Sequence, residues 1–169
     1  MILGPGSTSS GLLVSTALGT HIPNEQRSQR PSQAMAAAKS HWTATLPNIE
    51  HRSSRSTYNC MGLPFAARRT AIDPQHVRLI LAEDGYSQLP GLDHVVLGDL
   101  VLYYDSEGDL QHIGVVYERY RLMTNVGTPT GSWRTKVLSQ WGFDGEYVHQ
   151  IEDVPTAFGF PAEYWTDRL

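Results

Sequence analysis

The chain has 169 residues, of which 40% are hydrophobic and 18% are charged, and its formal net charge is −4. This length suits one domain that can build a core without metal or disulfide support. The acidic balance excludes a basic footprint for nucleic acid, and the single cysteine excludes an internal disulfide and a thiolate-rich zinc site. No apolar run approaches the roughly 20 residues that span a bilayer, so we expect no membrane partner and a cytoplasmic or secreted protein.

Residues 1–57 differ in composition from the rest, being rich in Ser, Thr, Pro, Gly and Gln. Such a stretch buries little apolar surface, so we expect a polar, mobile or loosely docked N-terminal extension with a short helix at Ala34–Lys39. Residues 58–169 then form the compact domain. Basic residues gather around the cysteine, and we interpret them as a solvated surface: Arg52, Arg55, Arg68 and Arg69.

The segment Tyr58–Arg69 contains the cysteine and is expected to be extended at first and then helical, with Asn59 as a suitable N-cap. Pro64 leaves two alternatives, because proline suits a first helical turn and breaks a helix interior. Either the helix starts at Cys60 and Pro64 strains its second turn, or it starts nearer Pro64 and Cys60 lies just ahead.

A second helix is predicted after Asp73, which is an N-cap residue followed by Pro74 at the first helical position. Gly85 marks its end. The buried face of this helix has apolar residues at helical spacing: Val77, Ile80 and Leu81.

Strands follow in the second half of the chain. The apolar runs Val95–Tyr104 and His112–Tyr117 flank a turn at Asp105–Gly108, which predicts a β-hairpin. A third strand is expected in Arg121–Val126, in Trp133–Ser139, or in both.

The tail Asp153–Trp165 is expected to be irregular but packed, because it is rich in aromatic residues. Helices followed by an antiparallel meander are the pattern of an α+β fold. In this order the cysteine opens the helical half, and His112 opens a strand of the sheet half.

Cys60 and His112 are the residues that could carry chemistry together. Thiol catalysis needs a thiolate, and both a helix N-terminus and a neighbouring imidazolium lower the pKa of a cysteine. A third polar group usually orients the imidazole. The structural alternative is that Cys60 is a small buried hydrophobe and His112 a polar residue at a strand end.

Five short motifs stand in a defined order along the chain: Tyr58-Asn-Cys60, Gly98–Asp105, His112–Val116, Leu138–Gly142 and Glu146–His149. The first three of these motifs resemble the NlpC- and CHAP-type papain-like superfamily. In that superfamily a cysteine at a helix N-terminus precedes a "GD-apolar" strand and an "H-x-G/A-apolar" strand. All of these motifs except Gly98–Asp105 are also similar to an uncharacterised bacterial family with "YNC", "HaA", "SK-x-G" and a late "H". The resemblance covers roughly residues 46 to 165.

The resemblance implies a papain-like fold and a role for each matching residue. Cys60 would be the nucleophile, His112 the general base, and Ser139 the third group by motif. Gln140 and Asn125 are chemically more usual third groups, and the choice stays open. His149 matches the late histidine of the narrower family, and its alternative role is structural.

The expected function is that of a cysteine hydrolase, a peptidase or amidase that cleaves an amide or isopeptide bond. Its partner would be a peptide or peptidoglycan-like substrate, and neither a cofactor nor a metal is expected. Two departures from the family pattern, Pro64 and an apparent insertion at Tyr120–Thr135, could shift the third group away from His112. Pro64 and the open choice of the third residue motivate an alternative, a papain-like binding domain without turnover. A further alternative is a secreted antibacterial or effector toxin of the same fold.

Overall fold

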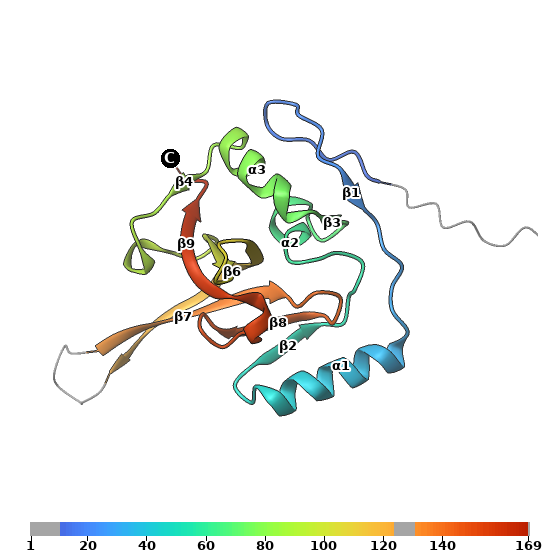
Figure 1. Ribbon diagram of the computed structural model, residues 1–169. Coiled ribbons are helices and arrows are strands. Elements are labelled where there is room, and N and C mark those ends of the chain that lie inside the picture. The colour runs from blue at the N-terminus through green and yellow to red at the C-terminus, as the bar shows by residue number, and fades with distance from the viewer. Residues whose placement is uncertain (1–10, 124–130, 169) are drawn as a thin grey trace, which may run out of the picture.

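The computed structural model describes residues 11–123 and 131–168 (Figure 1). Within these residues, a seven-stranded sheet has the order β2-β8-β7-β6-β5-β9-β4, and each pair of neighbours is antiparallel. A small second sheet pairs β1 with β3. The combination of helices with antiparallel sheet confirms the α+β class.

The elements have the following bounds. The helices are α1 (Ser32–Thr45), α2 (Gly62–Phe65) and α3 (Val77–Glu83), with 3-10 turns at Pro74–His76, Leu92–His94 and Thr156–Phe158. The strands are β1 (Asn24–Glu25), β2 (Glu50–Ser53), β3 (Ala71–Ile72), β4 (Ser87–Gln88), β5 (Leu100–Tyr104), β6 (Leu110–Met123), β7 (Gly131–Gln140), β8 (Glu146–Gln150) and β9 (Phe160–Thr166).

Residues 11–57 pack against the rest of the chain, in contrast to the loosely docked extension expected from their composition. β1 pairs with β3, and β2 forms an edge of the large sheet beside β8. Ile22 is buried in an apolar cluster with later residues. Strands on both sides of the expected boundary at residue 57 therefore pair with each other, because polar residues can join a sheet through their main chain.

Helix α1 is longer than the predicted Ala34–Lys39 segment and lies beside β2 (Figure 1). Trp42 fixes it, because its Nε1 donates to Asp144 Oδ2 at 3.0 Å and its ring lies 5.3 Å from that of Trp141. The extra length follows from these long-range contacts, which local propensity does not include.

The helix predicted after Asp73 is confirmed. The Asp73 carboxylate accepts the main-chain N–H of Gln75 at 3.0 Å, and Pro74 opens a 3-10 turn that continues into α3. All three predicted apolar residues of this helix are buried. Gly85 ends the helix with a left-handed φ of 77°, which glycine adopts without strain.

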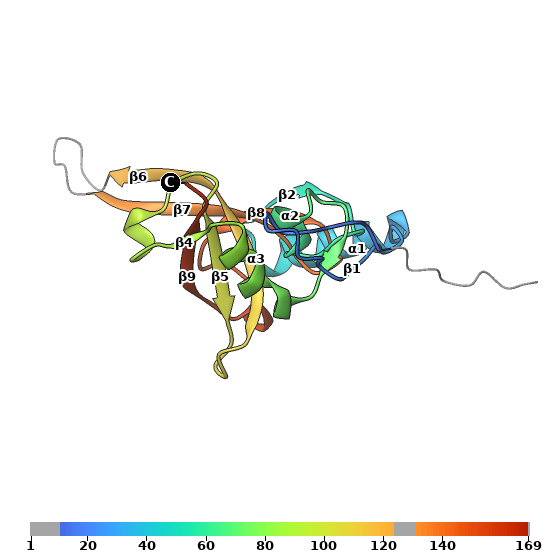
Figure 2. The same ribbon diagram turned by 90° about the horizontal axis from the view of Figure 1, so that it is seen from above.

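The predicted hairpin is confirmed as β5 and β6, with Leu102 opposite Ile113. β6 continues to Met123 and pairs with β7, so the two strands form an arm that projects at the end far from α1 in both views (Figures 1 and 2). The tail was predicted to be irregular, but it forms β9, which pairs with β5. Pro161 and the weak apolar alternation of this segment are untypical of a strand, so the sequence does not predict β9.

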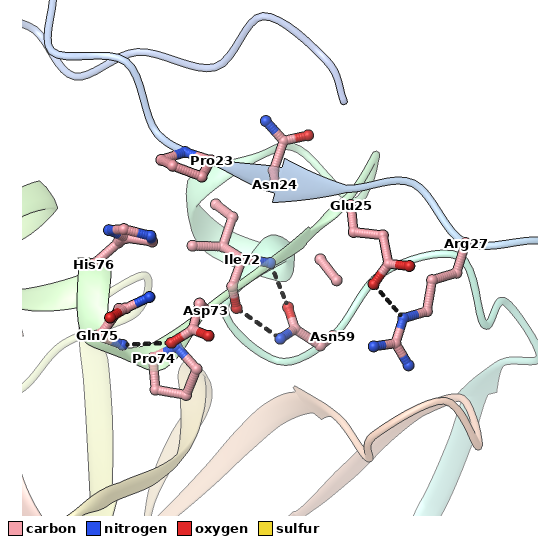
Figure 3. Close-up of a pocket in the computed structure, with 11 residues that line it drawn as sticks. Pro23, Asn24, Glu25, Arg27, Asn59, Ile72, Asp73, Pro74, Gln75 and His76 are labelled. Atoms are coloured by element: carbon pink, nitrogen blue, oxygen red, sulfur yellow. Dashed lines mark hydrogen bonds and ion pairs between the residues drawn. The ribbon is translucent and has the colours of Figure 1, made fainter. Parts of the chain in front are cut away.

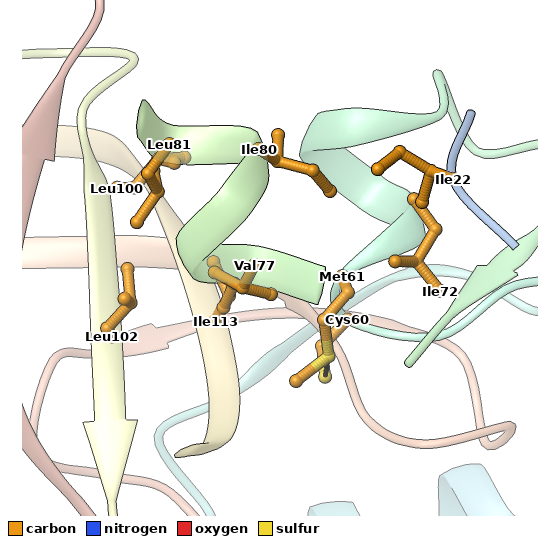
Figure 4. Close-up of a cluster of buried hydrophobic side chains, with 10 residues drawn as sticks. All are labelled: Ile22, Cys60, Met61, Ile72, Val77, Ile80, Leu81, Leu100, Leu102 and Ile113. Atoms are coloured by element: carbon orange, nitrogen blue, oxygen red, sulfur yellow. Dashed lines mark hydrogen bonds between the residues drawn. The ribbon is translucent and has the colours of Figure 1, made fainter. Parts of the chain in front are cut away.

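The central strands are buried on both faces. One face, with Leu100, Leu102 and Ile113, packs against α3 and Cys60 (Figure 4), and we call it the cysteine face. The opposite face, which we call the histidine face, has a second cluster that includes Val101 and Tyr103.

Candidate functional site

The turn before α2 holds Cys60 through its two preceding residues. Asn59 Oδ1 accepts the N–H groups of Gly62 and Ile72 at 3.0 and 3.1 Å, and its Nδ2 donates to the Ile72 carbonyl at 2.8 Å (Figure 3). The Tyr58 hydroxyl donates to buried Glu146 at 2.5 Å. The N-cap of α2 is Met61 rather than the predicted Asn59, whose side chain instead ties the cysteine turn to β3.

Helix α2 starts at Gly62, between the two predicted starts, so Cys60 lies just ahead of it. Pro64 falls within the only full turn of this short helix, where its missing N–H costs little. A side chain at Gly62 would place its Cβ 1.8 Å from the Thr70 carbonyl oxygen. Glycine at this position therefore lets the cysteine turn approach the β3 strand closely.

The Cys60 sulfur lies in the apolar cysteine face and is 6% exposed (Figure 4). Its S–H donates to the Met61 sulfur at 3.1 Å. Burial raises the pKa of the Cys60 thiol to about 11, although the main-chain N–H groups of Ile113, Met61 and Cys60 itself act in the opposite direction. The thiol is therefore neutral near pH 7.

His112 is fully buried on the histidine face of β6. Its ring stacks on Phe158 with centroids 4.3 Å apart and meets Tyr103 edge-on at 5.4 Å. Among the described residues, neither ring nitrogen has a hydrogen-bond partner. Burial lowers the pKa of His112 well below its usual value, and the positive form of His149 lowers it further. The ring is therefore a neutral imidazole with two unused nitrogens.

Ser139 and His149 are buried on the same face and bond to each other. His149 Nδ1 lies 2.7 Å from the Gln150 carbonyl, so it carries the proton and donates it. Nε2 therefore accepts the Ser139 hydroxyl at 2.8 Å, and Ser139 Oγ accepts the Trp141 N–H at 3.0 Å. Burial lowers the pKa of His149 to about 4, so this chain of bonds is neutral as well.

The structure places the sulfur and the His112 ring on different sides of one strand. Ile113 packs in the cysteine face with Cys60, whereas its neighbour His112 lies opposite Tyr103 on the histidine face. Consecutive strand residues point to opposite faces, so β6 lies between the thiol and the ring, and among the described residues no hydrogen bond joins them.

The candidate third groups have separate roles. Ser139 orients His149 rather than His112. Gln140 donates to the carbonyls of Arg55 and Gly142, at 2.9 and 3.3 Å, and so fixes the loop before the cysteine. Asn125 lies outside the described residues. The stacking of Phe158 on His112 was missed, and nothing in the sequence around this tail residue indicates it.

No family model, curated protein or solved structure matches the chain. In residues 11–123 and 131–168, no group of three or more His, Cys, Asp or Glu side chains could hold a metal ion. No helix in the same part of the chain is long and apolar enough to cross a membrane.

Proposed function

We propose that the chain is a papain-like cysteine hydrolase that cleaves an amide or isopeptide bond in a peptide or peptidoglycan-like substrate. Cys60 is the nucleophile and His112 the general base. The observation that carries the proposal is the fully buried His112 ring, which has no partner for either nitrogen among the described residues and adjoins Ile113, a residue of the cluster that holds Cys60. Burying an unpaired polar group costs about 1–3 kcal/mol, so a purely structural position favours an apolar residue.

The reaction starts from a neutral thiol and a neutral imidazole. Because β6 lies between the two groups, substrate binding in this scheme moves the cysteine turn as well as the side chain, so that the sulfur leaves Met61 and reaches His112, which accepts the thiol proton. The sulfur attacks the amide carbonyl, and the main-chain N–H groups near the sulfur stabilise the oxyanion. The C–N bond then breaks and the leaving amine takes the proton from His112. Water, with its proton accepted by His112, hydrolyses the thioester and restores the thiol.

Ser139 and His149 act in this scheme as positioning residues. A protonated His149 would repel the imidazolium that forms on His112, and coupling between the two rings is already present. The bonds to Ser139 and to the Gln150 carbonyl keep His149 in one neutral tautomer. The pair therefore keeps a second positive charge away from the catalytic imidazole.

The test is labelling by an electrophile that mimics a peptide amide and traps an activated thiol. Cys60→Ala should abolish labelling, and His112→Gln should slow it by about a hundredfold or more, because general-base catalysis contributes this much. His94→Ala changes an exposed histidine and is the matched control. Labelling of His112→Gln at the unaltered rate would refute the pair.

A second candidate function, a papain-like binding domain without turnover, is favoured by the burial of the thiol in an apolar cluster. With a pKa of about 11, about one thiol in ten thousand is ionised at pH 7. The rate of alkylation by iodoacetamide against pH distinguishes the two functions when candidate peptides are added. A peptide that moves the midpoint far below 11 supports the hydrolase, and an unmoved midpoint with peptide bound supports the binding domain.

A further inference from the structure

A cleft of about 480 Å³ lies beside the cysteine turn and contains four arginine side chains. Residues 26–28 and the segments on either side of Cys60 line this arginine cleft. Its lining residues are Gln26, Arg27, Ser28, Arg55, Thr57, Arg68 and Arg69. The chain as a whole has a net charge of −4, so this concentration of positive charge is local.

Three of the four guanidinium groups keep terminal nitrogens without a hydrogen-bond partner among the described residues: Arg27, Arg55 and Arg69. Arg27 uses only Nε, which donates to Glu25 at 3.1 Å, and neither Arg55 nor Arg69 takes part in a side-chain ion pair within this part of the chain. Arg68 is more fully used, because its Nε donates to Glu146 at 2.6 Å and its side chain also bonds to Tyr58. Arg27, Arg55 and Arg69 therefore keep the paired donors with which a guanidinium binds a carboxylate in two places.

Arg68 is held in place by an unusual main chain. Ala67 and Arg68 have left-handed φ values of 46° and 65°, which cost energy in residues other than glycine and cluster at functional positions. This turn directs the Arg68 Nε onto Glu146, which also accepts the Tyr58 hydroxyl. Strain is thus accepted where it fixes one arginine of the cleft.

Arg27 and Arg55 are also restrained. The Arg27 guanidinium lies 4.0 Å from the centroid of the Phe143 ring. The main chain of Arg55 accepts the buried Gln140 amide at 2.9 Å. Burial is the main cause of the raised pKa of Tyr58. The positive charges of Arg68 and Arg55 act in the opposite direction, so both guanidinium groups lie near the Tyr58 hydroxyl. Several of the guanidinium groups are therefore held in orientation before any ligand binds.

We infer that the arginine cleft binds an acidic peptide segment, with glutamate or aspartate carboxylates on the free guanidinium nitrogens. The cleft itself indicates carboxylates, because both ion-pair partners of its arginines are glutamates. Of the 13 basic residues in the chain, 11 are arginines, and the cleft has no lysine, which fits planar two-point binding rather than attraction to a point charge. The inference does not depend on thiol chemistry.

The test is fluorescence anisotropy with a fluorescein-labelled glutamate-rich peptide and the full chain carrying Cys60→Ala. Arg55→Gln and Arg69→Gln should each weaken binding by about tenfold, because each removes a charge-assisted contact. Neither side chain has an internal ion pair, so the thermal unfolding midpoints should stay unchanged. Arg134→Gln, an exposed arginine on β7, is the matched control and should change the affinity less than about twofold.

Three outcomes would overturn the inference. The first is equal binding of a peptide in which every glutamate is replaced by glutamine. The second is equal weakening by Arg134→Gln, which would indicate general electrostatic attraction. The third is stronger binding of pyrophosphate or of a single-stranded oligonucleotide than of the peptide, which would assign the cleft to phosphate ligands.

Discussion

His112 and His149 are two buried histidines on one face of the sheet, and their surroundings are opposite. His149 uses both ring nitrogens, one toward a carbonyl and one toward Ser139. His112 is equally buried, is packed between aromatic rings, and uses neither nitrogen within the described residues. Burial alone therefore does not distinguish a structural from a functional histidine, whereas the number of satisfied nitrogens does.

The difference follows from the positions of the two residues in the sheet. His149 lies opposite Val137 in the middle of the β7–β8 pairing, where Ser139 of the neighbouring strand points to the same face. His112 lies near the start of β6, before the pairing with β7 begins at Val115. His112 therefore has Tyr103 of β5 as a cross-strand neighbour but none in β7, and its two unpaired nitrogens are the place where a thiol or a substrate can bind.

Acidification should test both histidines together and give the largest effect. Folded His149 has a pKa of about 4, and the same group in the unfolded chain has 6.5. Below pH 6.5 the unfolded chain therefore binds a proton that the folded chain does not, so stability falls as the pH falls toward 4. The loss is about 3 kcal/mol from His149 alone, at about 1.4 kcal/mol per pKa unit, and His112 adds to it.

Urea unfolding at pH 7, 5.5 and 4 measures this loss. His149→Leu should remove part of the pH dependence, because it removes one of the two buried groups that must be protonated. An unfolding free energy that stays constant between pH 7 and 4 would contradict the burial of both rings in neutral form.

Replacing the satisfied histidine should destabilise the fold. His149→Leu leaves the Ser139 hydroxyl and the Gln150 carbonyl without their partner in a buried site. We expect the free energy of unfolding to fall by about 2–3 kcal/mol at pH 7. Chemical unfolding measures this loss of free energy, with His94→Leu as the exposed control. An equal effect of the two substitutions would contradict the structural role of His149.

The sequence predicts the local parts of this fold better than the long-range ones. The helix after Asp73 and the β5–β6 hairpin depend on caps, turn residues and apolar spacing, all of which are local. The docking of residues 11–57 and the pairing of β9 with β5 depend on main-chain bonds between distant segments. Neither composition nor periodicity encodes these bonds, which is why both were missed.

The same limit applies to the site. The closeness of Cys60 to a helix start could be predicted from residue types. The bond between Ser139 and His149 could not be predicted, because it depends on the β7–β8 register. That register pairs Ser139 with Tyr147 and pairs His149 with Val137, two residues before Ser139. A motif order identifies candidate residues, but the register decides which of them bond.

Ser139→Ala should have a smaller effect than the loss of His149. It leaves His149 Nε2 without a donor and the Trp141 N–H without an acceptor. We expect a loss of about 1–2 kcal/mol, together with weaker labelling of Cys60 if His149 acts on His112. Ser132→Ala, at an exposed position of the same strand, is the control. A stability loss without any change in labelling would restrict Ser139 to a structural role.

The smallest effect on stability, with the opposite sign, is expected for the unsatisfied histidine. His112→Leu removes two buried nitrogens that have no partner and keeps a similar side-chain volume between Phe158 and Tyr103. We expect the free energy of unfolding to rise by about 1 kcal/mol, because an apolar group of similar size avoids the cost of the unpaired ones. Labelling of Cys60 should be lost in the same variant. Sites that sacrifice stability for activity behave in this way, so a variant that is both less stable and normally labelled would show that His112 serves the core alone.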